Sequence, residues 1–235
     1  VPQEHAELVY FRQHGFEIYK RAQVLGIITR SSKGLCVAGT HGKTTTSTMA
    51  AHLLHQSHVG CTAFLGGISK NYGTNLLLSQ DSPYTVIEAD EFDRSFLRLH
   101  PEGAIVTAMD ADHMDIYRDM DDLRGAFIQF GRQVSGMIVV KKGLENYFRS
   151  GNIGAKIWTY GNGGDFSASD IVSDGHGKMY FTLNTPDGKI ENCHAGVPGA
   201  VYIENATAAA ALALLHGTSP ESIREGISSF RGVAR

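Results

Sequence analysis

The chain alternates between short apolar runs and segments whose apolar residues recur at helical spacing. Helical patterns follow the first run at residues 45–56 and precede the last one at residues 122–134. Strands that are apolar throughout and separated by crossovers are typical of a parallel sheet covered on both faces. We therefore expect an α/β fold with a mainly parallel sheet flanked by helices. Its strands are expected in the apolar runs at 35–39, 61–67, 84–90, 103–109 and 137–140.

Residues 165–197 have a different pattern. Strand-like runs are broken there by Asp-Gly-His-Gly and Pro-Asp-Gly, which are hairpin signals. They predict a small antiparallel sheet at one side of the main sheet. An alanine-rich helix then ends near Gly217, and a final helix begins at Ser219 with Pro220 in its first position.

The first 33 residues hold one short amphipathic pattern, made by Ala22, Leu25 and Ile28, and then a Ser-Ser-Lys-Gly connector. We interpret them as the tail of a preceding domain and a linker. The chain begins with Val1 and Pro2, without a methionine, and its last six residues, Phe-Arg-Gly-Val-Ala-Arg, follow directly on a helical pattern. We therefore expect it to be a piece of a longer protein.

Composition narrows the class of protein. The net charge is −3, with 42% hydrophobic and 19% charged residues, so no positive field favours nucleic acid or an anionic membrane. No apolar run approaches the roughly 20 residues of a membrane span. The three cysteines form no CxxC pair and suggest neither a disulfide framework nor a zinc site. We expect a cytoplasmic protein that binds neither nucleic acid nor membrane.

The stretch Gly-Thr-His-Gly-Lys-Thr-Thr-Thr at residues 39–46 predicts a phosphate-binding loop. It lies between an apolar strand and a helix, where free backbone N–H groups and the helix dipole face an anion. Its glycines are three positions apart rather than the five of the common Walker A pattern. This placement favours a nucleotide site over a glycine-rich turn with a solvated lysine, and the sheet is then of the P-loop type.

Within this loop we expect Lys43 to lie against the β- and γ-phosphates and Thr44 to reach a magnesium ion. The candidate ligands are therefore ATP and Mg²⁺. His41 either hydrogen-bonds a substrate or is an exposed side chain, and we favour the second because the chemistry requires no histidine there. The candidate nucleotide-binding residues in the loop are Gly39, Thr40, His41, Gly42, Lys43, Thr44 and Thr45.

Metal ligands are expected from other strand ends, because ligands in an open α/β sheet gather at the carboxyl ends of the strands. Glu88 ends one apolar run and His113 follows the next, with Asp112 and Asp115 beside it. Magnesium prefers oxygen ligands, so Glu88 is the expected ligand and His113 a less usual one. Three further carboxylates could replace them, and the sequence does not separate Asp90, Glu91 and Asp93.

Other polar residues carry less information. Three histidines lie three positions apart without a cysteine or carboxylate at metal spacing, so we interpret His52, His55 and His58 as surface residues. No Gly-x-Ser-x-Gly elbow or Cys/His nucleophile arrangement is present, which argues against covalent catalysis by the protein.

Together these motifs resemble the Mur ligases of peptidoglycan synthesis. The resemblance rests on "GTHGKTTT", "EADEFDRSFL", "DADHMDIY", "NATAAAALA" and "FRGVAR", in that order, and covers nearly the whole chain. It implies that Lys43 and His113 are catalytic and that Thr44, Glu88 and His113 hold metal. It also implies that Asn205 contacts ATP.

The resemblance also implies a domain organisation. Residues 1–33 would be the tail of an N-terminal UDP-binding domain with a linker. Residues 34–230 would be the central ATP-binding domain, and residues 231–235 the start of a link to a C-terminal domain. The N- and C-terminal domains of the same chain would then be missing partners of this fragment.

The implied chemistry is formation of an amide. Within the family, the branch that this chain resembles uses ATP to activate the carboxylate of UDP-N-acetylmuramate as an acyl phosphate, which the amine of L-alanine then attacks. Other Mur ligases have a carbamylated lysine beyond the histidine motif, whereas no lysine lies between His113 and Lys141 here, as in the alanine-adding branch. The family's usual His-Asn pair is replaced by Val201 and Tyr202, which puts adenine or ribose contacts there in doubt.

Three other readings stay open. A murein-peptide recycling ligase joins a preformed tripeptide to the same sugar nucleotide and has similar loops. Folylpolyglutamate synthase belongs to the same superfamily, although the acidic and histidine motifs fit it less well. As an isolated fragment, the chain could bind Mg-ATP without turnover.

Overall fold

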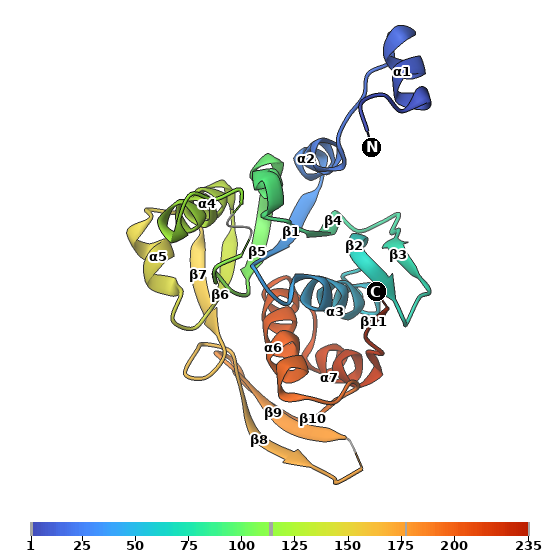
Figure 1. Ribbon diagram of the computed structural model, residues 1–235. Coiled ribbons are helices and arrows are strands. Elements are labelled where there is room, and N and C mark those ends of the chain that lie inside the picture. Colours follow the sequence, from blue (N-terminus) through green and yellow to red (C-terminus); the bar gives the residue numbers. More distant parts are fainter. Residues whose placement is uncertain (1, 113–114, 177, 235) are drawn as a thin grey trace.

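The computed structural model describes residues 2–112, 115–176 and 178–234. They form an eight-stranded sheet in the order β11-β2-β4-β1-β5-β6-β7, with β3 paired to β2 (Figure 1). The strands from β2 to β7 in this order pair in parallel, while β3 and β11 are antiparallel. This confirms the expected mainly parallel sheet. The strands are β1 (Lys33–Ala38), β2 (Thr62–Ser69), β3 (Thr74–Leu77), β4 (Tyr84–Glu88), β5 (Pro101–Val106), β6 (Met137–Lys141), β7 (Lys156–Tyr160) and β11 (Val233–Ala234).

Helices cover both faces of this sheet. One face carries α3 (Lys43–His55), α6 (Ala200–Leu215) and α7 (Pro220–Ser229), and the other carries α2 (Arg21–Ser31), η1 (Phe92–Arg98), α4 (Met120–Gln133) and α5 (Glu145–Ser150). Side chains of β1 alternate between the two cores: Leu35 and Val37 join the first, and Cys36 and Ala38 join the second. Burial on both faces is the physical reason that the strand is apolar from Gly34 to Ala38.

The N-terminal segment divides into two parts. Helix α1 (Ala6–Gln13) contains no buried residue and extends away from the sheet (Figure 1). Helix α2 instead packs against η1, since a Cβ on Gly26 would lie 2.5 Å from the carbonyl oxygen of Arg98. Leu25 and Thr29 of α2 are also buried. The expected boundary at residue 33 stays a prediction.

The small antiparallel sheet predicted after residue 165 is confirmed. It consists of β8 (Ser167–Ser173), β9 (Met179–Thr185) and β10 (Gly188–Ala195), in the order β10-β9-β8. Phe181, Leu183 and Ile190 join it to the core that α6 and α7 share. Helix α7 begins as predicted, because the hydroxyl of Ser219 accepts a hydrogen bond from the backbone N–H of Ser222.

Strand β1 lies between β4 and β5. After β1 the chain first forms strands on one side of it, β2 and β4, and then crosses to β5 on its other side. In an open α/β sheet this arrangement opens a crevice beyond the carboxyl ends of the strands. The segments after β1, β4 and β5 therefore meet at one place. Within the described residues, no helix has both the length and the apolar character that a membrane span needs.

The interpretation of three surface histidines was wrong for His52. This side chain is only 4% exposed, and its ring nitrogens lie 2.8 Å from the hydroxyl of Tyr72 and 2.9 Å from that of Ser229. Helix α3 is covered by the sheet, α6 and α7, so a polar residue on it is buried with partners. His55 is half-buried and His58 is exposed. Burial, the largest cause, and the neighbouring His55 together lower the pKa of His52 to about 4.

This pKa predicts a loss of stability in mild acid. The unfolded chain protonates His52 near its ordinary pKa of 6.5, whereas the folded chain resists protonation down to about 4. The histidine's contribution is thus present above pH 6.5 and is lost as the pH falls toward 4. Between pH 7 and pH 5 it should lower the free energy of unfolding by about 2 kcal/mol. Urea unfolding at the two pH values should show a smaller drop in His52→Gln; an equal drop in both proteins would contradict the assignment.

Candidate functional site

Residues 39–42 form a tight turn that only glycine permits at two positions. Gly39 has φ of 135° and Gly42 has φ of 81°, both in the region that side chains disfavour. A Cβ on Gly39 would also collide with the hydroxyl of Thr107. Gly42 is the N-cap of α3, so the turn leads directly into the amino end of that helix. The two glycines therefore permit the backbone turn that leads from β1 into α3.

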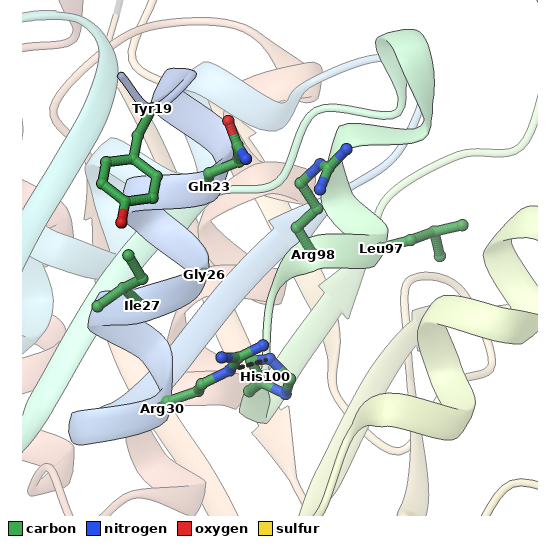
Figure 2. A pocket seen from close by; sticks show the side chains of 8 residues that line it. All are labelled: Tyr19, Gln23, Gly26, Ile27, Arg30, Leu97, Arg98 and His100. Carbon is green, nitrogen blue, oxygen red and sulfur yellow. Dashed lines mark hydrogen bonds between the residues drawn. The ribbon is translucent and has the colours of Figure 1, made fainter. Parts of the chain in front are cut away.

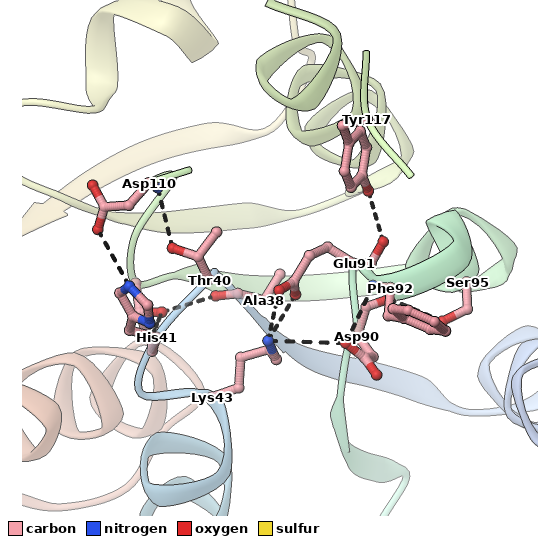
Figure 3. A network of polar contacts seen from close by, with 11 residues as sticks. Ala38, Thr40, His41, Lys43, Asp90, Glu91, Phe92, Ser95, Asp110 and Tyr117 are labelled. Atoms are coloured by element: carbon pink, nitrogen blue, oxygen red, sulfur yellow. Dashed lines mark hydrogen bonds and ion pairs between the residues drawn. The ribbon is translucent and has the colours of Figure 1, made fainter. Parts of the chain in front are cut away.

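The loop is fixed to the segment that follows β5. The N–H of Thr40 donates to the carbonyl of Ala108 at 3.1 Å, and the hydroxyl of Thr40 accepts from the N–H of Asp110 at 3.1 Å. The hydroxyl of Thr107 contacts the carbonyl oxygen of His41. The side chain of His41 is 67% exposed and lies 3.9 Å from the carboxylate of Asp110. The backbone and threonine contacts thus fix the loop to this segment, and the exposed His41 side chain adds only the longer contact with Asp110 (Figure 3).

Helix α3 presents its amino end beyond this turn. Lys43, Thr44 and Thr45 form its first turn, and all three are half-buried. The first backbone N–H groups of a helix lack partners within the helix and carry its positive dipole end. The arrangement is therefore a ready site for an anion such as phosphate.

The ammonium group of Lys43 is held by an acidic side chain from the segment after β4. It lies 2.8 Å from each carboxylate oxygen of Glu91 and 3.9 Å from Asp90 (Figure 3). The side chain of Lys43 is 13% exposed and that of Glu91 is fully buried. The hydroxyl of Tyr117 donates to the backbone carbonyl of Glu91 at 2.6 Å. Of the three carboxylates that the sequence left open as ligands, Glu91 is the one whose two oxygens both contact the ammonium of Lys43.

Glu88 ends β4, in register with Val37 of β1, and reaches the first turn of α3. Burial raises the pKa of its carboxyl group, while a hydrogen bond from Thr44 and the charge of Lys43 act in the opposite direction. Its Oε2 atom is buried and has no hydrogen-bond partner. A Cβ on Gly66 of β2 would collide with the carboxylate, so this glycine makes room for it. An oxygen ligand without a partner beside a threonine hydroxyl fits a hard cation.

Asn205 brings α6 to the same place. Its side-chain oxygen accepts a hydrogen bond from the hydroxyl of Thr46 at 3.2 Å, and a Cβ on Gly42 would lie 3.1 Å from it. Val201 and Tyr202 stand where the family usually has a His-Asn pair. Val201 is 67% exposed and Tyr202 is half-buried. The structure therefore brings together the loop residues, Glu88 and Asn205.

His113, the other expected metal ligand, lies outside the described residues. Among the residues that the structure does describe, no group of three or more His, Cys, Asp and Glu side chains has the arrangement of a metal centre. Magnesium needs no such group, since it retains several waters and is bound through few protein oxygens.

Three residues of the site were not identified from the sequence: Gly66, Thr107 and Tyr117. Glu91 was named as one of three carboxylates, but no pattern separated it from its neighbours. Gly66 adjoins Glu88, and Thr107 contacts the turn at 39–42. Both of these partners are distant in the sequence. A glycine pair inside an apolar strand was the one available signal for Gly66.

A separate cavity of about 530 Å³ lies between α2 and η1 (Figure 2). None of the expected site residues lines it. Arg30 donates to His100 there at 2.9 Å, and both residues adjoin the amino ends of strands rather than the carboxyl ends. The cavity is lined by Tyr19, Gln23, Gly26, Ile27, Arg30, Leu97, Arg98 and His100.

The fold and the turn before α3 define an α/β domain with a phosphate-loop type of anion site. Comparison with known proteins makes this specific: residues 37–213 match the Mur ligase middle domain. The chain belongs to the Mur ligase family.

Individual relatives agree with this membership. The chain is 55% identical over its whole length to a UDP-N-acetylmuramate–L-alanine ligase of Phocaeicola vulgatus, of which it covers 52%. It thus spans about half the length of the curated relatives that it matches.

Solved structures show the same fold. A UDP-N-acetylmuramate-alanine ligase of Thermotoga maritima superposes with a TM-score of 0.82 at 26% identity, over all of this chain and 54% of that one. A ligase of Neisseria meningitides named for the tripeptide L-alanyl-gamma-D-glutamyl-meso-diaminopimelate superposes with a TM-score of 0.84 at 24% identity, over 100% of this chain and 78% of that one. The second likeness concerns the fold alone.

Proposed function

We propose that this chain is the ATP-binding part of a ligase that joins L-alanine to the carboxylate of UDP-N-acetylmuramate. The observation that carries the proposal is the convergence of Lys43, Thr44 and Glu88 at a rigid phosphate loop. The names of relatives up to 55% identical support the two substrates. The absence of a protein nucleophile in the sequence agrees with chemistry in which the substrate's own carboxylate attacks the phosphate.

The residues present fit ATP with magnesium. When bound, Mg-ATP supplies the phosphoryl group that activates the carboxylate, and the ion neutralises charge on the phosphates. The buried, unpartnered Oε2 of Glu88 and the hydroxyl of Thr44 are the oxygens that would hold the ion. We further propose that His113 takes part, as the family resemblance implies.

The chain's own groups would bind and orient the nucleotide. The N–H groups of the turn and of the first turn of α3 face the phosphates, and Lys43 adds a positive charge. Because the turn is already fixed by Thr107 and Ala108, little ordering is needed when the anion arrives. Asn205 approaches the same turn from α6 and is proposed to contact ATP.

Two alternatives remain. The similarity of fold to a tripeptide ligase keeps the recycling activity as the second candidate. In addition, we propose that the isolated 235-residue chain binds Mg-ATP without turnover, because it spans only half of its relatives. Alanine-dependent phosphate release by the purified chain would refute this last point.

The choice of acceptor can be tested in a full-length ligase that carries this chain. With UDP-N-acetylmuramate and ATP, we expect phosphate release to depend on L-alanine and to be slow with the tripeptide. The measurement is phosphate release at matched acceptor concentrations, with identification of the product by mass. Turnover with the tripeptide alone would establish the recycling activity instead.

The role of Lys43 can be tested by Lys43→Ala in the same full-length protein. Loss of the cation that faces the phosphates should lower kcat/KM by at least about 100-fold, a cost near 3 kcal/mol in the barrier. Lys70→Ala is the matched control, because Lys70 is exposed at the end of β2. A Lys43→Ala enzyme within about threefold of wild type, less than 1 kcal/mol, would exclude Lys43 from the site.

Glu88→Gln tests the magnesium site in the 235-residue chain itself. Burial already raises the pKa of the Glu88 carboxyl, so a neutral amide of the same shape should not lower stability in the absence of metal. In the wild-type chain, Mg²⁺ should tighten binding of a non-hydrolysable ATP analogue by about tenfold or more. Glu88→Gln should lose most of this gain in calorimetric titrations with and without Mg²⁺. The same gain in both proteins would show that Glu88 is not a ligand.

A further inference from the structure

Glu91 is the residue in the crevice that the phosphate-loop chemistry leaves unexplained. Its side chain is fully buried, and both of its oxygens lie 2.8 Å from the ammonium group of Lys43. A carboxylate close to a phosphate site repels the ligand, so its presence there needs a physical reason.

The position of Glu91 is fixed by its surroundings. Tyr117 donates to its backbone carbonyl at 2.6 Å, and Tyr117 is itself 1% exposed. The guanidinium of Arg94 lies 4.9 Å from the centre of the Tyr117 ring and is paired with Asp122 at 2.7 Å. These contacts tie the segment after β4 to the start of α4. The backbone of Glu91 is therefore anchored by contacts that do not involve Lys43.

Lys43 is in turn held by Glu91. If its ammonium left Glu91, this buried carboxylate would lose the cation that contacts both of its oxygens, which is unfavourable. An ammonium group has three N–H donors, so it can keep Glu91 and still donate to a phosphate. The Lys43 side chain is not fully enclosed, since 13% of its surface stays exposed.

We propose that Glu91 is a positioning residue, which holds the ammonium of Lys43 at the phosphate loop before the nucleotide arrives and keeps it there afterwards. Lys43 has four rotatable side-chain bonds, and without this partner its head group would sample other rotamers. The nucleotide then meets a cation that is already placed (Figure 3). This inference rests on the proposed function, since it concerns the same phosphate site.

The test uses inorganic triphosphate as the probe and the 235-residue chain as the protein. Triphosphate has the charged part of ATP without the base, and its affinity is measured by calorimetry. Glu91→Gln removes the charge and keeps the shape, and we expect its Kd to rise by about tenfold or more. Glu91→Asp keeps the charge but withdraws it by one methylene, so its Kd should be intermediate.

Asp93→Asn is the matched control from the same segment. Asp93 pairs with Lys20 at 3.6 Å, and both side chains are largely exposed, so the loss of this pair costs little. Its φ of 53° is one that asparagine tolerates well. We expect a Kd within about twofold of wild type and an unchanged unfolding temperature.

A second readout separates positioning from a merely structural role. In a full-length ligase carrying Glu91→Gln, assayed well below its unfolding temperature, KM for ATP should rise and kcat should fall. KM for the acceptor should be unchanged. A purely structural residue would lower the unfolding temperature and leave these constants unaltered.

The outcomes distinguish this inference from the function on which it rests. If wild-type chain does not bind triphosphate, the proposed function and the inference both fail. If wild type binds and a folded Glu91→Gln or Glu91→Asp variant binds equally well or more tightly, only the positioning role is overturned, and Glu91 is then a competitor of phosphate or a structural residue.

Discussion

The site depends on the burial of β1 at the centre of the sheet. Every residue from Gly34 to Ala38 is buried, with β4 and β5 on its sides and helical layers on both faces. Because this strand cannot shift without disrupting both cores, the turn after it has a fixed origin. The neighbouring strands end at the same level and deliver Glu88 from one side and Thr107 from the other. The anion site is thus a consequence of strand order.

The strands and helices around this turn hold charged side chains where little water is present. A charge there is stabilised when it has a partner of opposite sign. Lys43 is paired with Glu91, while Glu88 has an oxygen without a partner and a raised pKa caused by burial. The two carboxylates therefore differ in their partners. The oxygens of Glu91 contact the ammonium of Lys43, whereas one oxygen of Glu88 has no hydrogen-bond partner. This difference supports the proposals that Glu91 positions Lys43 and that Glu88 holds a metal ion, at two positions only three residues apart.

The features that could be predicted from the sequence are those set by the pattern of neighbouring residues. Apolar runs and glycine spacing are properties of adjacent residues, so the strands around the loop, the turn at Gly39 and Gly42, and the antiparallel hairpins could be inferred. Strands β3, β7 and β11 were not, because they are short, edge-like or partly polar.

The features that could not be predicted depend on contacts between residues far apart in the sequence. Glu91 could not be separated from Asp90 and Asp93, because the chain turns sharply there through left-handed conformations at Asp93 and Arg94. The burial of His52 depends on Tyr72 and Ser229, which no helical periodicity reveals.

The two acceptors considered for the proposed function are compatible with one fold. A structure named for a tripeptide acceptor and one named for alanine superpose on this chain about equally well. Under the proposed function, the loop at residues 39–42, Glu88 and Asn205 would serve the step that precedes acceptor attack, and that step is common to both candidate reactions. The groups described here therefore bear on activation of the carboxylate, and the argument for alanine comes from sequence identity to the curated relatives. A change of acceptor need not alter the crevice at β1, because selection of the amine is a separate physical task from holding the phosphates.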